Sequence, residues 1–289
     1  VEGEIWYNST SGSLKVAPMV GSWASGGNLT TARRNLGGAG IQTAALAIGG
    51  ESPATGKTES YDGTSWTEVA DLNTARNTLG ATGTQTAAIA FGGESVTTAT
   101  ETWNGSSWTT SPNSLNTAVR SNAGFGTTAA AVAFGGLASP GARTTVTETW
   151  NGSAWATSPN SLPAATSNMG GFGISTAGVE CSGEAVPGKT AVTSEWDGSA
   201  WASGGAMITA RSRMGAGIGT QTYGLVAGGD VPAITATAEI YNGTTWAATG
   251  SLATARGSLA GLGPSSVSSD GLVSGGYTTS DTNATEEFT

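Results

Sequence analysis

The chain has 289 residues, of which only 11% are charged, and it carries a net charge of −9 at pH 7. This acidity disfavours nucleic acid and anionic membrane surfaces as partners, because both attract clusters of Lys and Arg. No apolar run approaches the ~18 residues of a membrane span, so we expect no membrane insertion. The chain holds one Cys and no His, which excludes an intramolecular disulfide and removes the commonest metal ligand and general base. We therefore expect no metal and no cofactor.

Residues 1–19 are predicted to form a β connector, with a hairpin whose strands are Glu4–Tyr7 and Ser13–Val16. Since the chain begins at Val1 rather than Met, we expect a processed or excerpted chain. The segment resembles a short β-element of bacteriophage tail-fibre and other virion structural proteins, where it connects modules. Because Trp6 and Tyr7 lie outside the repeat, they are our candidates for contact with a neighbouring chain, and a homo-oligomer joined through this segment is the corresponding hypothesis. A strand packed on the following domain is the alternative.

Residues 20–289 are predicted to form one repetitive domain. A nine-residue phrase ending in Trp recurs at intervals of 42–47 residues, as Thr58–Trp66, Thr100–Trp108, Thr147–Trp155, Thr193–Trp201 and Ala238–Trp246. A period of this size indicates one supersecondary unit stacked many times.

The unit Asn73–Trp108 predicts four short antiparallel strands, called a to d. They are Thr78–Gly83, the apolar run Ala87–Phe91, the alternating run Thr100–Trp103, and a strand that begins at Ser107. Strand b ends at a Gly-Gly pair, and an Asn-Gly hairpin turn joins strand c to strand d. Four such strands per repeat are typical of the blades of a β-propeller.

Six blades are predicted. A Gly-Gly pair after strand b occurs five times, Ser182-Gly183 takes its place once, and strand c carries six aromatic residues, at Tyr61, Trp103, Trp150, Trp196, Tyr241 and Phe288. The last unit stops at Phe288, before its Trp, and the missing strand d is found near the N-terminus at Trp23. We therefore predict an all-β, six-bladed propeller, closed where the N-terminal strand d joins the C-terminal strands a to c. Deleting residues 20–29 should destabilise the whole domain.

A Gly-Gly pair after an apolar strand, an aromatic residue about a dozen residues later and a Trp five residues beyond it resemble the kelch repeat. The resemblance covers about residues 20–289. It implies a propeller whose loops bind partners, and it does not imply one activity. Kelch-fold oxidases bind copper through His and a modified Tyr, so the absence of His excludes that branch.

Two charged sets recur with the blades. Arginines precede strand a, with Thr166 in the fourth unit, at Arg33, Arg76, Arg120, Arg211 and Arg256. In a ring they would gather on the face of the d–a and b–c loops, either as an anion or acidic-glycan site or, as we favour, bonded to nearby carboxylates and carbonyls. Glutamates recur on strand c at Glu59, Glu101, Glu148, Glu239 and Glu286. Equivalent positions on different blades diverge, so paired-carboxylate catalysis is disfavoured.

Other repeated residues have structural explanations. The strand-d tryptophans occur once per blade, which favours inter-blade packing over sugar stacking. Cys181 replaces a core aromatic of strand b, which favours a small core residue over a nucleophile. The glycosylation sequons at Asn104, Asn151 and Asn242 coincide with hairpin turns.

The b–c loops differ from blade to blade, and variable loops on a rigid scaffold commonly carry function. The loops of interest are Glu51–Lys57, Leu137–Thr145, Glu184–Lys189 and Asp230–Ala236. The candidate binding residues of this face are Glu51, Lys57, Glu94, Pro140, Arg143, Glu184, Lys189, Asp230 and Tyr277.

We expect a non-enzymatic structural or binding propeller with no catalytic residue. The first hypothesis is a phage virion surface component, such as a tail fibre, spike or decoration, that contacts other virion subunits and a host surface glycan or protein. Its location would be the virion or the extracellular space. The alternative is a secreted or cell-surface bacterial lectin-like module. An enzyme with a carboxylate site in the central channel is the least favoured hypothesis.

Overall fold

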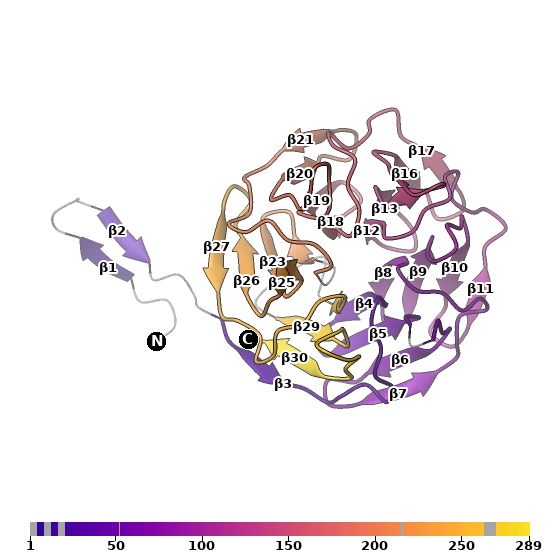
Figure 1. The fold of residues 1–289 in the computed structure, drawn as a ribbon, viewed down its shortest axis with the longest axis horizontal. Coiled ribbons are helices and arrows are strands. Elements are labelled where there is room, and N and C mark those ends of the chain that lie inside the picture. Colours follow the sequence, from indigo (N-terminus) through magenta and orange to yellow (C-terminus); the bar gives the residue numbers. More distant parts are fainter. Residues whose placement is uncertain (1–4, 9–12, 17–20, 52, 215–216, 263–269) are drawn as a thin grey trace.

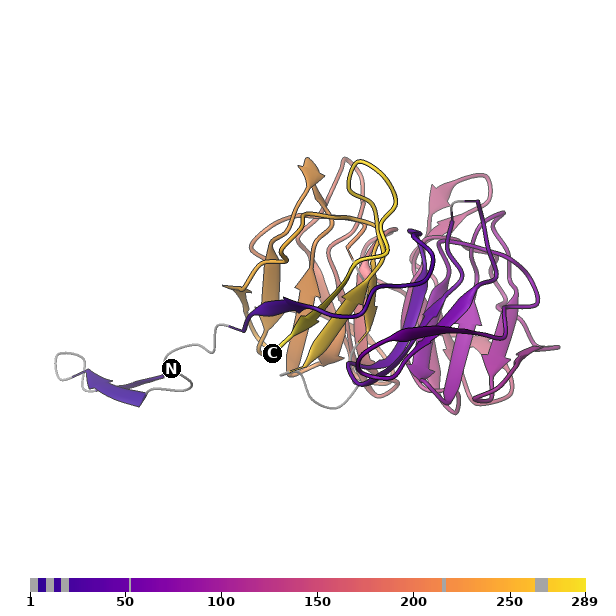
Figure 2. The ribbon, with the colours of Figure 1, turned by 90° about the horizontal axis from the view of Figure 1, so that it is seen from below.

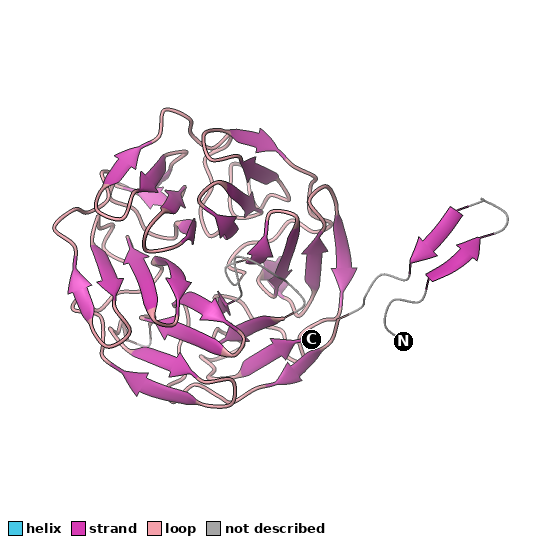
Figure 3. Ribbon diagram, turned by 180° about the vertical axis from the view of Figure 1, so that it is seen from behind, coloured by secondary structure: helices cyan, strands magenta, loops and turns pink. Residues whose placement is uncertain are grey.

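The computed structural model describes residues 5–8, 13–16, 21–51, 53–214, 217–262 and 270–289. Six four-stranded antiparallel sheets stand around a central axis like the blades of a propeller (Figure 1). The described residues are strands, turns and loops without a helix (Figure 3). The predicted fold class, an all-β six-bladed propeller, is confirmed.

Each blade runs from its strand a at the axis to its strand d at the rim. In chain order the blades are β4–β7 (Gly37–Ile41, Ala44–Ile48, Thr58–Tyr61, Trp66–Val69), β8–β11 (Gly80–Thr84, Ala87–Phe91, Thr100–Trp103, Trp108–Thr110), β12, β13, β16 and β17 (Ala123–Gly126, Ala131–Phe134, Thr147–Trp150, Trp155–Thr157), β18–β21 (Gly170–Ile174, Ala177–Cys181, Thr193–Trp196, Trp201–Ser203), β22, β23, β26 and β27 (Ile218–Thr220, Tyr223–Ala227, Ala238–Tyr241, Trp246–Thr249), and β28, β29, β30 and β3 (Ala260–Leu262, Gly271–Ser274, Thr285–Phe288, Trp23–Ser25). We number them blades 1 to 6 in this order.

The ring closes in blade 6, as predicted from the split repeat. Strand β3 pairs with β30, with Trp23 opposite Phe288 and their ring centroids 5.1 Å apart (Figures 1 and 2). Beyond the strands, Ser22 and Thr289 exchange backbone hydrogen bonds of 2.9 and 3.0 Å. The first and last described parts of the propeller thus complete one sheet, which removes an open edge.

The strands of blade 2 follow the expected positions closely. Strands β9 and β10 have the predicted bounds, and β11 begins at Trp108, one residue after the expected start. Strand β8 begins at Gly80 rather than Thr78, because Thr78 has a left-handed φ of 52° and bonds to the neighbouring blade. Gly92 of the Gly-Gly pair also has a positive φ of 66°, and a Cβ there would lie 2.8 Å from the oxygen of Val119. Gly92 thus takes this conformation without strain, and Ser182 takes the same left-handed conformation at this place in blade 4, with a φ of 62°.

The core lies between adjacent blades, and the strand-d tryptophans join them. In five blades the indole N–H donates to the hydroxyl of a Thr that begins strand c of the preceding blade, in the pairs Trp66–Thr285, Trp108–Thr58, Trp155–Thr100, Trp201–Thr147 and Trp246–Thr193. Blade 5 has Ala238 at the threonine position, and Trp23 donates to the carbonyl of Gly250 instead. The tryptophans are therefore inter-blade packing residues with satisfied N–H groups.

The N-terminal hairpin is present. Strands β1 (Ile5–Asn8) and β2 (Ser13–Val16) pair with each other, and not with a blade. The first strand starts one residue later than expected, since Glu4 lies outside the described residues. Trp6 and Tyr7 lie in β1, and their side chains are outside the described part of the structure.

Removal of the closing strand should destabilise the entire propeller. Deleting residues 21–29 exposes the edge of β30, uncovers Phe288 and removes the buried Leu29. We expect the free energy of unfolding to fall by more than about 3 kcal/mol in a denaturant titration, the scale of losing large buried side chains. Deleting residues 1–16, whose described strands β1 and β2 pair with each other, is the control and should change it by less than about 0.5 kcal/mol. Equal losses in both deletions would contradict the closure.

The inter-blade hydrogen bond of Trp108 should be measurable on its own. Thr58→Val keeps the volume of the side chain but removes the hydroxyl that accepts from the indole 3.0 Å away. We expect thermal or chemical unfolding to show a loss of about 1–2 kcal/mol, because a buried donor is left without a partner. The matched variant Thr109→Val lies at an exposed position of β11 and should be nearly neutral. A neutral Thr58→Val would show that this contact does not join the blades.

Candidate functional site

A closed circle of backbone hydrogen bonds surrounds the axis, which we call the collar. One residue per blade takes a left-handed φ of 52–56°, in the set Asn35, Thr78, Ser121, Asn168, Arg213 and Ser258. The N–H of each donates to the carbonyl of its counterpart in the preceding blade at 2.6–3.0 Å, and Asn35 completes the circle by donating to Ser258. A left-handed φ is unfavourable for residues other than Gly, so the inter-blade bonds must hold this conformation.

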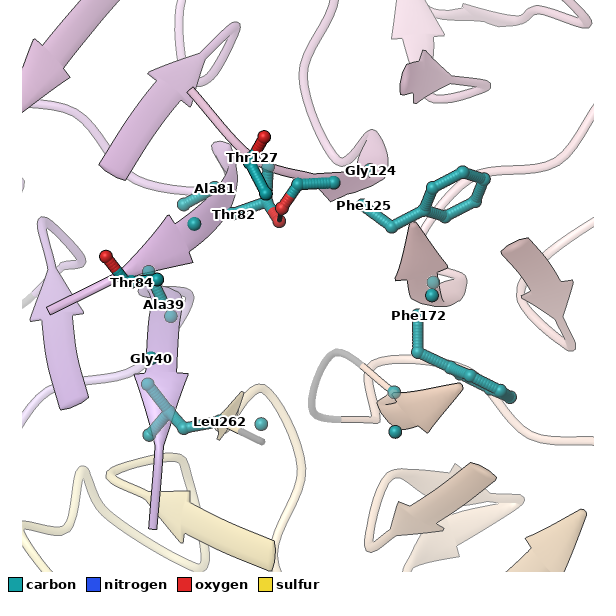
Figure 4. A pocket seen from close by; sticks show the side chains of 18 of the residues that line it. Ala39, Gly40, Ala81, Thr82, Thr84, Gly124, Phe125, Thr127, Phe172 and Leu262 are labelled. Carbon is teal, nitrogen blue, oxygen red and sulfur yellow. Dashed lines mark hydrogen bonds between the residues drawn. The ribbon is translucent and has the colours of Figure 1, made fainter. Parts of the chain in front are cut away.

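The collar separates two mouths of the axial channel. On the side of the d–a and b–c loops, a cavity of about 600 Å³ is lined by collar residues and by charged side chains that include Arg34, Glu51, Glu94, Arg120, Glu184 and Asp230. We call it the charged mouth. On the opposite side, a cavity of about 190 Å³ is lined by glycines, small side chains, Phe125, Phe172 and Leu262 (Figure 4). We call it the glycine mouth, and only the charged mouth combines size with polar groups.

Ion pairs line the rim of the charged mouth. They are Arg34–Glu51 at 2.7 Å, Arg34–Asp281 at 3.5 Å, Arg120–Glu94 at 3.4 Å, Arg143–Glu184 at 3.1 Å and Arg213–Asp230 at 3.7 Å. All nine residues in these pairs are partly exposed, and such pairs contribute at most about 1 kcal/mol each to stability. Their main effect is therefore to hold charged groups in place around the cavity.

Arg34 makes more side-chain interactions than the other residues of these ion pairs, since it contacts Glu51, Asp281 and Tyr277. Its guanidinium lies over the ring of Tyr277, 4.8 Å from the centroid, while it bonds to Glu51. The hydrogen bond that Arg34 donates to Glu51 raises the pKa of Arg34 above its usual value. The guanidinium is thus fixed between a carboxylate and an aromatic face, and the outer part of Tyr277 remains half-buried beside the cavity.

Five of the candidate binding residues line the charged mouth, namely Glu51, Glu94, Glu184, Asp230 and Tyr277. Arg143 reaches the rim through its ion pair with Glu184.

Three other candidates do not line this cavity. Lys57 bonds to Glu68 at 2.7 Å. Pro140 is exposed at the tip between β14 (Leu137–Ala138) and β15 (Ala142–Arg143). Lys189 forms a backbone bridge with Glu184. The loops therefore bring the residues next to the Gly-Gly pairs into the mouth, whereas the far ends of the loops lie outside it.

Arg34, Arg213 and Asp281 were missed by the sequence reasoning. Arg34 and Arg213 follow the repeated arginines Arg33 and Arg211 by one and two residues, and neither belongs to the repeat. A second Arg close to a repeated one was the sequence signal that could have identified Arg34 and Arg213 as residues of the mouth.

The repeated arginines form buried ion pairs within their own blades, which fits the interpretation that we favoured. The pairs are Arg33–Glu59, Arg76–Glu101, Arg211–Glu239 and Arg256–Glu286, with side chains no more than 5% exposed. Burial lowers the pKa of Arg76 and of Arg256, and the paired carboxylate opposes this effect. These guanidinium groups are occupied inside the blades and do not face the mouth.

Arg120 does not belong to that set, so its assignment was wrong. Gly93 donates its N–H to the carbonyl of Val119, as Gly50 donates to that of Arg76, and Val119 is therefore the counterpart of the buried arginines. The side chain of Arg120 lies one residue further along and reaches the rim, where it pairs with Glu94.

The strand-c glutamates are buried and hydrogen-bonded. Glu59 accepts the backbone N–H of Thr30, Glu101 that of Asn73, and Glu148 that of Asn116. Each carboxylate is held within its own blade, which agrees with a structural role for the set.

Blade 4 departs from this arrangement. Thr166 and Ser194 stand in place of the Arg and the Glu, and strand β19 contributes Glu180, whose counterpart in blade 1 is Ala47. Burial raises the pKa of Glu180 to about 8, although hydrogen bonds from Ser194 and Thr166 partly oppose it. This carboxyl is therefore largely protonated at neutral pH.

Other chemistry is scarce in the described ranges. No cluster of three or more His, Cys, Asp or Glu side chains could hold a metal ion there. Burial raises the pKa of the Cys181 thiol, which makes it a poor nucleophile. None of the described segments is a helix long and apolar enough to cross a membrane.

Comparison with known proteins supports the fold. No family model and no curated protein matches the chain. A solved structure described as the structure of YjhT is similar, with a TM-score of 0.72 and 14% sequence identity over 89% of this chain and 95% of that one. At this identity the likeness shows the fold alone. The protein is a six-bladed β-propeller.

The raised pKa of Glu180 predicts a stability that falls with increasing pH. The unfolded carboxyl has a pKa near 4.5 and the folded one about 8, so the folded state is favoured fully below pH 4.5 and loses stability up to about pH 8. Unfolding titrations from pH 4.5 to 9 should show a loss of a few kcal/mol, which Glu180→Gln should largely remove. Glu68→Gln at an exposed position is the control and should keep the wild-type slope. An unchanged slope in Glu180→Gln would contradict the prediction.

Proposed function

We propose that this protein is a non-catalytic binding propeller that takes a polar, hydroxyl-rich ligand, such as part of a surface carbohydrate, at the charged mouth. The observation that carries the proposal is the cavity of about 600 Å³, walled by charged loop residues and floored by the collar. Small-molecule sites commonly have volumes of about 300–1,000 Å³ and a few convergent polar groups. A rigid collar beneath variable loops is the arrangement in which binding residues are commonly found.

The charge of the rim favours a neutral ligand over a strongly charged one. Within the described residues, the rim ion pairs bring together four guanidinium groups and five carboxylates. Guanidinium groups donate hydrogen bonds and carboxylates accept them, so both sides of a sugar hydroxyl can be satisfied. Tyr277 adds an aromatic face at the same cavity. These groups suit a saccharide better than a polyanion, whose charge the carboxylates would repel.

A binding role without catalysis is supported by the placement of the carboxylates, because each of the five at the rim of the charged mouth is paired with an arginine. The repeated glutamates are committed to bonds inside the blades. The described residues that line the glycine mouth include no titratable side chain.

We further propose that the propeller is a kelch-like domain on the surface of a phage virion, where it mediates attachment or assembly. Support comes from the resemblance of residues 1–19 to a connecting element of virion structural proteins and from the separate pairing of β1 with β2. The same binding face would serve a secreted or cell-surface bacterial lectin-like module, which is the alternative. The virion proposal and the lectin-like alternative differ in the structure to which residues 1–19 attach the propeller, and they share the same class of ligand.

A glycan array tests the binding site. The whole chain should be retained on a subset of glycans, and Tyr277→Ala and Asp230→Asn should each weaken binding at least tenfold, because they remove a stacking face and an acceptor from the charged mouth. The matched variant Thr84→Ala at the glycine mouth should bind like wild type. Circular dichroism melting should show that all variants stay folded. Absence of retention, or equal loss in Thr84→Ala, would overturn the assignment to the charged mouth.

Mass spectrometry of purified phage particles tests the location. The virion proposal expects peptides of this chain at a fixed number of copies per particle. Their absence would overturn it and favour the lectin-like alternative.

A further inference from the structure

Five blades carry the same turn between strands c and d, and the turn exists in two chemical forms. It begins with Asn-Gly in blades 2, 3 and 5, at Asn104, Asn151 and Asn242, and with Asp-Gly in blades 1 and 4, at Asp62 and Asp197. All five of these side chains are exposed to solvent. The fold therefore accepts either an amide or a carboxylate at this position.

The turn holds the side-chain carbonyl of each asparagine in one place. Oδ1 of Asn104 accepts the backbone N–H of Ser106, the backbone N–H of Ser107 and the hydroxyl of Ser106, each at 2.9 Å. Asn151 and Asn242 have equivalent bonds in their own turns, at 2.8–3.4 Å. Donors that converge on a carbonyl oxygen stabilise the negative charge that develops there when its carbon is attacked. Cγ of each asparagine is thus activated toward a nucleophile.

The nearest nucleophile along the chain is the backbone nitrogen of the following glycine. Gly105, Gly152 and Gly243 have positive φ angles of 96°, 91° and 87°. A glycine has no side chain to obstruct the rotation that brings its nitrogen toward Cγ of the preceding residue. Among the described residues, the N–H groups of these three glycines have no hydrogen-bond acceptor. Their protons are therefore available to hydroxide from the solvent.

Blades 1 and 4 show that an aspartate fits the same turn. Oδ1 of Asp62 accepts the backbone N–H groups of Ser65 and Thr64 at 2.8 and 2.9 Å. The hydrogen bond from Ser65, together with those from Thr64, lowers the pKa of Asp62 to about 2. The bond from the N–H of Ala200 has the same effect on the pKa of Asp197. Hydrogen bonds to a charged acceptor are stronger than those to a neutral one, so the turn stabilises a carboxylate more than an amide.

We propose that Asn104, Asn151 and Asn242 are sites of spontaneous deamidation, which converts the turns of blades 2, 3 and 5 into the Asp-Gly form of blades 1 and 4. Hydroxide removes the proton of the glycine N–H, and the nitrogen forms a bond to Cγ while the electron pair of the carbonyl moves to Oδ1. As that pair returns, the Cγ–Nδ2 bond breaks, and Nδ2 takes a proton from water and leaves as ammonia. Water then adds to Cγ of the cyclic imide, the bond from Cγ to the glycine nitrogen breaks, and this nitrogen regains its proton.

The turn also selects the product. Opening of the imide at Cγ gives aspartate, whereas opening at the main-chain carbonyl gives isoaspartate, which lengthens the backbone by one methylene group. The donors that hold Oδ1 polarise Cγ and favour the first opening. An additional methylene group would also disturb the turn that pairs Trp103 with Trp108 across strands c and d. Aspartate is therefore the expected product in the folded chain.

The added charge would lie away from the proposed binding site. The c–d turns lie next to the a–b turns, as Gly105 does next to Thr86. The a–b turns follow the strand-a ends that line the glycine mouth. Complete conversion thus adds three negative charges at the side of the glycine mouth, to a chain whose net charge is already −9, and leaves the residues of the charged mouth unchanged.

Ageing of the purified chain tests the proposal. The whole folded chain is incubated in mildly alkaline buffer, and anion-exchange chromatography should resolve forms with one, two and three additional negative charges. Peptide mass spectrometry should place the changes at the three Asn-Gly pairs, while Asn113, which is exposed and precedes a Ser, keeps its amide. The ratio of aspartate to isoaspartate should exceed that of the same chain unfolded in urea by about threefold or more. A folded chain without deamidation, or an equal ratio in the two states, would overturn the proposal.

Two variants separate the effect of the turn from that of the Asn-Gly sequence. Asp62→Asn keeps the donors of its turn and should create a fourth site of deamidation. Ser106→Ala removes one donor from Asn104 and should slow deamidation there by about threefold to tenfold, less than in a buried oxyanion hole because the turn is exposed. In that variant Asn151 should react at the wild-type rate, which makes it the internal control. An unreactive Asp62→Asn, or an unchanged rate at Asn104 in Ser106→Ala, would contradict the role of the turn.

Discussion

The collar is the constraint on which the rest of the structure depends. Six backbone N–H groups and six carbonyls form a closed circle, and the circle can close only when six blades contribute one residue each. The left-handed φ of these residues turns each chain from the rim loops into strand a, so the collar sets where every blade begins. It also sets the boundary between the two mouths, because its residues line the floor of the charged mouth. The binding site that we propose would therefore lie on a backbone that is hydrogen-bonded from blade to blade around the whole ring.

The repeated side chains pair mainly with one another, although some buried guanidinium nitrogens, such as Nε of Arg76 and of Arg256, have no hydrogen-bond partner among the described residues. Trp pairs with Thr between blades, Arg pairs with Glu inside blades, and Asn-Gly turns bond to their own backbone, as Asn104 does to Ser106 and Ser107. Groups that are buried and paired inside the fold are unavailable to a ligand. The residues left for binding are those that differ between blades, such as Arg34, Arg213 and Tyr277 at the charged mouth. The repeated residues thus stabilise the fold, and the binding that we propose rests on residues that differ between blades.

Much of the fold could be predicted because strand pattern and period are local signals. The bounds of β9 and β10 and the closure of Trp23 on Phe288 followed from alternation, Gly-Gly pairs and the split repeat. The start of β8 could not, since the φ of Thr78 is imposed by the neighbouring blade. Arg120 was assigned to the wrong set because the arginines were aligned by their spacing, and Arg120 lies one residue beyond the equivalent position in blade 3. The Asn-Thr-Ala motif before Val119 would have identified Val119 as the equivalent residue. Only some residues of the charged mouth were predicted, because the geometry of the ring, and not the length of a loop, decides which loop residues meet at the axis.

Blades 3 and 4 show two solutions to the same electrostatic problem. Each lacks the buried arginine, and each keeps a buried carboxyl in its interior, Glu148 in one and Glu180 in the other. In blade 4 the carboxyl moves to strand b, its only side-chain partners are hydroxyls, and burial raises its pKa so that it is largely neutral. In blade 3 the carboxylate keeps the backbone N–H donors that stabilise its charged form, at Asn116 and Thr117. Blade 4 therefore replaces the ion pair by hydroxyl donors and a raised pKa, whereas in blade 3 backbone N–H groups donate to the carboxylate.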